Sequence, residues 1–405
     1  MGAQPDGFKW PEDGHLPPSD AESGADRPLV AYVHVPFCTV RCGYCDFNTY
    51  TKGFGEGANL DTYADSVLRE IERSAQNLSL AGMPLRPLRS VFIGGGTPSL
   101  LDPVQVGRIT GALKETFGFA KGAEVTLETN PETATQERME GFAGAGINRV
   151  SMGMQSAVPR VLGVLDRLHT PEKVPGAVQA AAAAGMRVSL DLIYGAPTET
   201  LEEWRQSLEA AIALDPEHIS AYSLIVEPGT KMANRIGRGE LPETDPDLDA
   251  DKYQMAAEIL ADAGFHWYEI SNFAKNDQAR SLHNLAYWRD WDWWGYGPGA
   301  HSHIGRLRWW NVKHPRAYAG RLGQGMSPGV AGEQLDSEQR GLEQLMLAIR
   351  TREGVGLEDV PSQMGVGRLV EEGLGEVSAD GRFTLSLQGR LLADYATRVL
   401  AGWES

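Results

Sequence analysis

The sequence predicts an α/β fold with a mostly parallel sheet, followed by a smaller C-terminal domain that combines helices with a hairpin. Short runs rich in β-branched residues alternate with helical patterns six times, and the connections between them are short. Such alternation is typical of parallel strands joined by right-handed crossovers. The length of 405 residues allows roughly two to three domains. Periodicity alone leaves a full barrel, a partial barrel and an open sheet as alternatives.

The elements of this repeat follow from their hydrophobic patterns, period two for strands and period 3.6 for helices. The expected strands are Leu29–Val35, Ser90–Ile93, Glu124–Leu127, Arg149–Gly153, Arg187–Ile193 and His218–Ile225. The expected helices span residues 60–78, 103–117, 134–145, 172–184 and 200–214.

The segment before the first strand, residues 1–27, has a different character. It contains several prolines, glycines and acidic residues and shows no apolar periodicity. A chain of this composition has too little apolar surface to bury. We therefore expect residues 1–27 to form a disordered tail.

The repeat is followed by a helix at residues 247–263 and by one further strand in the sequence HWYEISNFA. Residues 283–310 are then unusually aromatic. They contain six of the ten tryptophans of the chain, together with His283, His301 and His303. We include this segment in the first domain, which we expect to span residues 28–325.

A domain boundary is expected near residue 325, because Gly323 to Gly332 contains four glycines and a proline. Beyond it, Leu342, Leu345, Met346 and Ile349 lie on one face of a helix. Asp380-Gly381 then marks a tight hairpin turn. Helices followed by a hairpin predict a winged-helix-like α+β domain over residues 326–405, with a scaffolding role.

Composition excludes several classes of function. Lys plus Arg number 37 against 54 Asp plus Glu, a net charge of −17 that repels phosphate backbones, so we expect no nucleic-acid partner. Three cysteines cannot build a disulfide scaffold. No apolar run approaches the roughly 18 residues of a membrane span. We expect a cytoplasmic protein, either free or peripheral at the membrane.

All three cysteines lie within eight residues, Cys38, Cys42 and Cys45, directly after the first expected strand. In a reducing compartment, clustered thiols indicate a metal site. A structural zinc ion would need a fourth ligand, which His34 could supply. A four-iron cluster can instead take three cysteines and keep one iron open to a small molecule. We favour the cluster because of the motifs that accompany the cysteines.

The spacing C-x3-C-x2-C after the first strand, with Tyr44 before the last cysteine, resembles the radical S-adenosylmethionine (SAM) superfamily. The sequence GGGTPSLL after the second strand resembles the glycine-rich segment that contacts SAM in that superfamily. Glycines permit a close approach of the backbone to a ligand. The resemblance implies a partial (β/α)6 barrel of the TIM type that carries a [4Fe-4S] cluster and SAM.

Further segments resemble the coproporphyrinogen dehydrogenase-like branch of the superfamily: YVHVPFC, TLETNP, RVSMGMQS, LDLIYGAP, HISAYSLIVEPGT, YEISNFA and HNLAYW. Carboxylates suit the ammonium and ribose groups of SAM, and an arginine suits its carboxylate. The positions that the resemblance implies for SAM binding, besides Tyr44, are Tyr32, Gly95, Gly96, Thr97, Glu128, Gln155, Arg167, Asp191 and Ile225.

Two functions of different class remain within this branch. Its porphyrinogen-oxidising enzymes have a fourth cysteine two residues after the third, where this sequence has Phe47, and a longer N-terminal extension. Both departures favour the haem chaperones of the branch, which share CDFNTY and HNLAYW. The first hypothesis is a haem carrier with a cluster and SAM. The alternative is a radical enzyme that oxidises a porphyrinogen.

The HNLAYW motif supplies the chemistry that haem requires. Iron binds an imidazole, and the macrocycle needs flat aromatic surface. His283 is expected to be the axial ligand, with Tyr287 and Trp288 as aromatic walls, although a core histidine beside packed tryptophans is the other interpretation. His301 and His303 compete for the ligand role.

The carrier hypothesis implies partners as well as cofactors. Haem would pass to haem-accepting apo-proteins, among them respiratory enzymes of the membrane. A reductant such as a flavodoxin or a ferredoxin would serve the cluster. No sequence feature identifies a particular acceptor.

Overall fold

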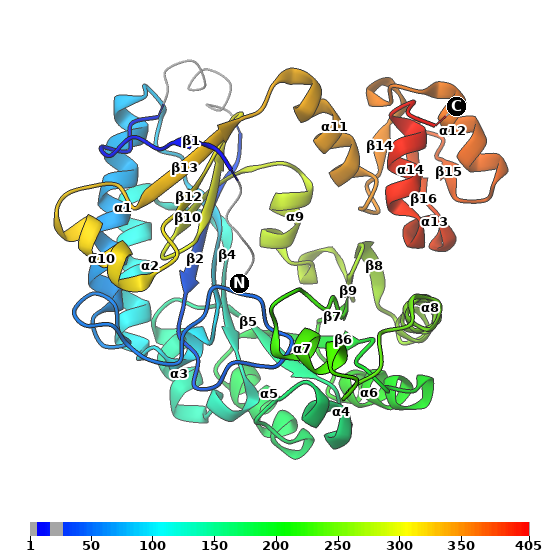
Figure 1. The fold of residues 1–405 in the computed structure, drawn as a ribbon, viewed down its shortest axis with the longest axis horizontal. Coiled ribbons are helices and arrows are strands. Elements are labelled where there is room, and N and C mark those ends of the chain that lie inside the picture. The colour runs from blue at the N-terminus through cyan, green and yellow to red at the C-terminus, as the bar shows by residue number, and fades with distance from the viewer. Residues whose placement is uncertain (1–5, 17–26, 405) are drawn as a thin grey trace.

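The computed structural model describes residues 6–16 and 27–404. Its core is a 13-stranded sheet in which six neighbouring parallel strands follow the chain order, β2 to β7. The strands are β2 (Leu29–Val35), β3 (Leu88–Gly95), β4 (Phe119–Thr129), β5 (Arg149–Gln155), β6 (Arg187–Tyr194) and β7 (His218–Ser223). All six expected strands are confirmed, and the sheet curves as a partial barrel (Figure 1).

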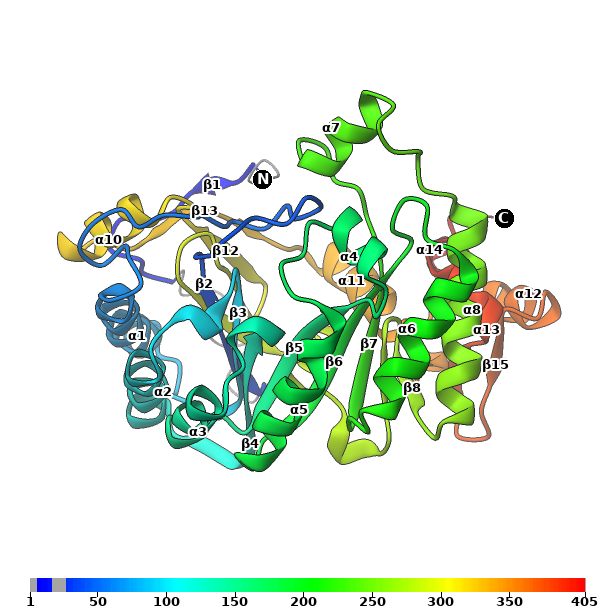
Figure 2. The same cartoon turned by 90° about the horizontal axis from the view of Figure 1, so that it is seen from below.

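Helices cover the outer face of this curved sheet (Figure 2). They are α1 (Tyr63–Leu80), α2 (Pro103–Phe117), α3 (Gln136–Gly144), α5 (Val174–Ala183), α6 (Leu201–Ala213) and α8 (Pro246–Asp262). Two shorter helices, α4 (Pro159–Val164) and α7 (Lys231–Gly237), lie at the carboxyl ends of the strands instead. Local signals start several of them: Asp102 caps α2, and Thr200 with Glu203 forms a capping box on α6. The expected helices are confirmed. The short α4 and α7 were not anticipated.

Both edges of the parallel sheet are extended. On one side, β10 (Asp292–Tyr296) pairs in parallel with β2, and three antiparallel strands follow, β11 (His301–Ile304), β12 (Leu307–Asn311) and β13 (Gly329–Gln334). On the other side, β7 pairs with β9 (Asn272–Ala274) and β9 with β8 (His266–Glu269). The sequence HWYEISNFA is therefore a hairpin, and the expectation of a single strand is wrong. Two further helices, α9 (Leu282–Trp288) and α10 (Pro315–Gly323), connect these strands.

The expectation of a disordered tail is wrong for residues 6–16. The short strand β1 (Phe8–Lys9) pairs antiparallel with β13. Trp10 follows it, is only 2% exposed, and stacks on Trp309 with 4.9 Å between ring centroids. The free energy gained by burying this large ring offsets the conformational entropy lost when the segment becomes ordered. The rest of the expected tail, residues 1–5 and 17–26, lies outside the described residues.

The same tryptophan corrects the predicted domain boundary. Side chains at Gly329 and Gly332 would place a Cβ 2.4 and 2.8 Å from the Trp10 ring. The glycines thus make room for packing and do not mark a linker. Because β13 belongs to the large sheet, the first domain extends beyond residue 325 to Gln334.

The C-terminal domain has a core of its own, which includes Leu345, Leu369 and Phe383. A three-stranded sheet in the order β14-β16-β15 packs with helices, and the hairpin turn at Asp380-Gly381 lies between two of the strands, as expected. The elements are α11 (Ser337–Ala348), β14 (Val355–Gly356), α12 (Gln363–Glu371), β15 (Gly375–Val377), β16 (Arg382–Leu385), α13 (Leu387–Leu391) and α14 (Ala393–Leu400). Figure 1 shows this domain beside the barrel, beyond α11.

Contacts between the two domains are local. The Arg390 guanidinium lies 4.2 Å from the centre of the Trp267 ring, and Arg289 forms an ion pair with Glu353. The C-terminal domain packs against β8 and the end of α9, and its helix α11 also contacts β11 and β12 through Arg340 and Glu343. In the described part of the chain, none of the helices combines the length and the apolar composition that crossing a bilayer requires.

Replacing Trp10 by alanine is expected to lower the free energy of unfolding by about 3–5 kcal/mol, because a buried ring is lost from a site that glycines shape. Denaturant unfolding would measure this loss. Lys9→Ala is the matched control: Lys9 lies on β1 immediately before Trp10 and its side chain is exposed, so a change within roughly 0.5 kcal/mol is expected. Equal effects of the two substitutions would contradict the assigned role of Trp10.

Candidate functional site

The main cavity, of about 620 Å³, lies inside the partial barrel. It opens at the carboxyl ends of the parallel strands, where Thr97 follows β3, Asn130 follows β4 and Gln155 ends β5. It reaches down to Arg149 and His218, the first residues of β5 and β7. Active sites of barrel enzymes gather at the carboxyl ends of the strands. The cavity is therefore the candidate functional site.

A loop that leaves β2 carries the three cysteines over the mouth of this cavity. The amide of Cys38 donates to the carbonyl of Tyr50 (2.9 Å), and the amide of Tyr50 donates to the carbonyl of Pro36 (2.7 Å), so the two ends of the loop are tied together. The amide of Met232 donates to the carbonyl of Gly43. All three thiols are free and partly buried, and all three line the cavity.

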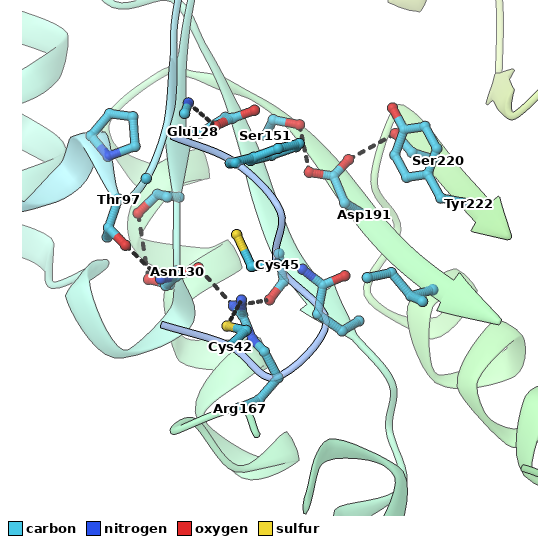
Figure 3. Close-up of a pocket in the computed structure, with 18 of the residues that line it drawn as sticks. Cys42, Cys45, Thr97, Glu128, Asn130, Ser151, Arg167, Asp191, Ser220 and Tyr222 are labelled. Carbon is cyan, nitrogen blue, oxygen red and sulfur yellow. Dashed lines mark hydrogen bonds between the residues drawn. The ribbon is translucent and has the colours of Figure 1, made fainter. Parts of the chain in front are cut away.

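The thiols have polar neighbours from the strand ends. Arg167 Nη1 lies 3.5 Å from Cys42 Sγ, and Thr97 Oγ1 lies 3.8 Å from Cys38 Sγ. Burial and the neighbouring thiols raise the pKa of Cys38 to about 11. Such thiols ionise when they ligate a metal. Figure 3 shows Arg167 beside Cys42 and Asn130.

The donor set fits an iron–sulfur cluster better than a single zinc ion. Across residues 6–16 and 27–404, no three His, Cys, Asp or Glu side chains converge closely enough for one metal ion. Both ring nitrogens of His34 are engaged, Nδ1 with Tyr32 (3.0 Å) and Nε2 with the carbonyl of Asn48 (2.9 Å). His34 is therefore no fourth zinc ligand here. Three thiols spread over one loop suit the larger [4Fe-4S] core.

The glycine segment has a local structural reason as well. Gly95 has φ +114°, a conformation that favours glycine, and a Cβ there would lie 2.6 Å from the His34 ring. A Cβ at Gly96 would lie 3.0 Å from Cys38 Sγ. The glycines thus allow β3 to approach the cysteine loop, while both line the cavity. The structure shows a close approach of the chain to itself at these glycines, and their contact with SAM stays a prediction.

Two half-buried carboxyl groups face the cavity. The amide of Gly95 donates to Glu128 Oε2 (2.8 Å), and burial raises the pKa of Glu128 to about 8. Ser151 and Ser220 donate to the two oxygens of Asp191 (both 2.7 Å), and burial raises the pKa of this carboxyl also. Figure 3 shows Asp191 held between these two hydroxyls. A cationic ligand bound beside these two carboxyl groups would lower their pKa values and favour their ionised forms.

Gln155 and Arg167 complete the polar rim. Gln155 has φ +62°, which is strained for a side-chain-bearing residue, and its buried Oε1 has no hydrogen-bond partner among the described residues. Arg167 Nη2 donates to Asn130 Oδ1 (2.7 Å). A strained residue with an unsatisfied acceptor facing the cavity is typical of a site that awaits a ligand.

Most of the predicted SAM and cluster positions come together in this cavity. The residues that line it are Cys38, Cys42, Tyr44, Cys45, Gly95, Gly96, Thr97, Glu128, Gln155, Arg167, Asp191 and Ile225. Ile225 does so from beyond the end of β7, which stops at Ser223, and its side chain is exposed. Tyr32 lies elsewhere: its hydroxyl contacts His34, and it lines a second cavity.

Sequence reasoning missed several polar lining residues. Their common signal is alternation: inward side chains recur every second residue along β4, β5, β6 and β7. The lining residues in this pattern are Thr126, Glu128, Asn130, Arg149, Ser151, Gly153, Gln155, Ser189, Asp191, Ile193, His218, Ser220 and Tyr222. Polar side chains therefore line the cavity from the first to the last residues of β5 and β7.

The expectation that His283 presents an open imidazole is not met by this structure. His283 is 1% exposed, and its ring nitrogens bond to Ser90 Oγ (2.8 Å) and Tyr287 Oη (3.0 Å). Burial lowers its pKa to about 3. It is the satisfied core histidine of the other interpretation. Trp288 lines neither cavity, and its indole hydrogen-bonds to Glu269.

His303 is also enclosed. Its side chain is fully buried, its Nε2 lies 2.7 Å from the carbonyl of Gly305, and Arg340 packs against it. His301, in contrast, is exposed and lines the second cavity together with Tyr287. Of the three histidines in the aromatic segment, His301 is thus the one open to a ligand.

Comparison with known proteins agrees with this geometry. The model of the radical SAM superfamily matches residues 32–211. The haem chaperone HemW of Mycobacterium tuberculosis is 41% identical over 384 residues, covering 93% of this chain and 95% of the relative. The haem chaperone HemW of Synechocystis sp. is 37% identical, covering 83% and 81%. The structure of coproporphyrinogen III oxidase (HemN) from Escherichia coli, a radical SAM enzyme, superposes with a TM-score of 0.78 at 22% identity, covering 98% and 97%. The last likeness shows a shared fold.

Glu128 is expected to make the cofactor-free protein less stable as pH rises. Its pKa is raised from 4.5 to about 8, so the folded state holds more protons than the unfolded state between these values, and stability falls with pH across that window. The variant Glu128→Gln lacks this carboxyl and should not lose stability for this reason. Its free energy of unfolding minus that of wild type should therefore increase between pH 5 and pH 8.5, by on the order of 1–3 kcal/mol.

Denaturant unfolding at several pH values measures this difference. Glu70 and Glu269, whose pKa values are also raised, to about 7 and about 8, are present in both proteins and cancel. Glu137→Gln, at an exposed position of α3, is the surface control. A stability difference for Glu128→Gln that does not change with pH would show that Glu128 is ionised in the fold.

Proposed function

Since this chain belongs to the haem chaperone HemW family of the radical SAM superfamily, we propose that it binds haem and transfers it to haem-accepting proteins. The similarity to a curated haem chaperone at 41% identity along 93% of the chain carries this proposal. It extends through the cysteine loop, the barrel and the aromatic segment alike. The partners are haem-accepting apo-proteins, and we place respiratory enzymes of the membrane among them.

Membership of the superfamily implies a [4Fe-4S] cluster and SAM. Cys38, Cys42 and Cys45 would hold the cluster, which supplies one open iron and an electron for SAM when it is bound. Glu128 and Asp191 offer carboxyl groups for the cationic and hydroxyl groups of SAM. Gln155 offers an unsatisfied acceptor at the rim. A flavodoxin or a ferredoxin is the class of reductant that such a cluster needs.

The second candidate function is oxidation of a porphyrinogen, and the shared fold with HemN favours its consideration. Phe47 argues against it. This residue stands where the porphyrinogen-oxidising enzymes have their fourth cysteine, and its side chain is 56% exposed with no metal-binding atom. Fold likeness at 22% identity carries no activity. The carrier function is therefore the one that we adopt.

The function is tested with the full-length protein, reconstituted anaerobically and loaded with ferric haem. Incubation with an apo-cytochrome b and separation of the two proteins should leave the Soret absorption with the acceptor. In a parallel reaction with coproporphyrinogen, SAM and reductant, no decarboxylated product should form. Absence of haem binding, or product formation at the rate of a porphyrinogen-oxidising enzyme, would refute the proposed function.

The cluster is tested by composition. Anaerobic reconstitution should give about four irons and four sulfides per chain. Replacing Cys38, Cys42 and Cys45 by serine should abolish both, because the three thiolates are the protein ligands. Thr39→Ala, an exposed change in the same loop, should leave the content unchanged. One zinc ion per chain without cluster absorption would contradict the assignment.

A further inference from the structure

A second cavity, of about 450 Å³, lies where the end of the cysteine loop meets the aromatic segment. We call it the His301 cavity. Phe47 contributes from the loop, Tyr287 from α9, Trp293 from β10 and His301 from the start of β11. The cavity is smaller than the main one but more open to solvent, which suits a cargo that must leave again.

His301 is the only histidine of the aromatic segment with an open ring in this structure. Its ring stacks on Trp310 with 5.6 Å between centroids, and within the described residues neither ring nitrogen is hydrogen-bonded. His283 uses both ring nitrogens to hold the fold, and His303 is buried with its Nε2 against Gly305 and Arg340. Partial burial and the nearby Lys313 and Arg308 lower the pKa of His301. A lowered pKa favours the neutral imidazole, which is the form that ligates iron.

The remaining walls match the other parts of haem. Trp293 and Tyr287, whose rings meet edge to face at 4.9 Å, give aromatic surface for the macrocycle. The indole N–H of Trp293 also donates to the backbone carbonyl of His301 (3.1 Å). This hydrogen bond fixes the backbone that carries the imidazole. Lys313 brings a cationic side chain to the same cavity, and the propionates of haem are its natural partners.

Phe47 links this cavity to the cluster loop. Asp46 and Phe47 follow Cys45 directly and line both the main cavity and the His301 cavity. A single exposed phenylalanine is ordinary on a protein surface, but this one forms part of two cavity walls. A flat apolar ligand in the His301 cavity would cover it.

We propose that haem binds in the His301 cavity with His301 as its axial ligand, on the other side of Asp46 and Phe47 from the main cavity. This inference rests on the proposed haem-carrier function and names where the cargo is held. It departs from the expectation that His283 is the ligand.

The test titrates ferric haem into three reconstituted full-length proteins: wild type, His301→Ala and His283→Gln. Iron and sulfide content and circular dichroism confirm that each variant is folded and loaded. His301→Ala should shift the Soret maximum and weaken haem binding by at least the roughly 10-fold that loss of a partner of a metal ligand costs. Added free imidazole should restore the wild-type spectrum of His301→Ala, which a merely structural role would not allow. His283→Gln, whose amide can keep bonds to Ser90 and Tyr287, should retain the wild-type spectrum.

The outcomes separate the inference from the function on which it rests. If His301→Ala binds haem with unchanged affinity and spectrum, the ligand assignment is wrong while the carrier function stands. If folded His283→Gln shows a changed Soret maximum and weaker haem binding while His301→Ala behaves like wild type, the ligand role returns to His283. If wild-type protein binds no haem at all, the proposed function itself fails.

Discussion

The pairing of β2 with two neighbours governs the arrangement of the whole molecule. β2 lies in parallel register with β3 on one side and with β10 on the other. The loop that leaves β2 is therefore set between the mouth of the barrel and the aromatic segment, although these are far apart in sequence. The buried carboxyl of Glu70 on α1 strengthens this junction, because it accepts hydrogen bonds from the Gly297 amide and the Asn311 amide group. Without this shared ladder, the two cavities would not meet at Asp46 and Phe47.

The central fold was predictable because its signals are local. The strand β2 is a nearly continuous apolar run. The strands β5 to β7 alternate apolar residues with polar residues that face the cavity. The pairing of β1 with β13 was not predictable in the same way. It joins residues more than 300 positions apart, and the glycines that accommodate Trp10 resemble a linker when only their composition is considered. The strands β10 to β12 were missed because their tryptophans and histidines resembled a ligand-binding segment, although the same residues form strands.

The same distinction between local and long-range signals applies to the residues of the candidate site. The cysteine loop and the strand-end residues were predicted from motifs, since each motif follows directly on a strand. Ser151 and Ser220 were not, although the alternation of polar residues on β5 and β7 contains the signal. The environment of His283 could not be derived from its own neighbours in sequence. Ser90, which holds one of its ring nitrogens, is 193 residues away, and only the pairing of strands and helices brings the two together.

The polar interior of the barrel has a consequence for the life of the protein in the cell. Where a barrel of this kind is filled by layers of aliphatic side chains, the core exists as soon as the chain folds. Here hydroxyl groups, two carboxyl groups and an unsatisfied amide face a hollow instead. Ligands that bind only the folded chain add their binding free energy to its stability. Iron supply and cofactor supply would therefore set how long a newly made molecule escapes proteolysis.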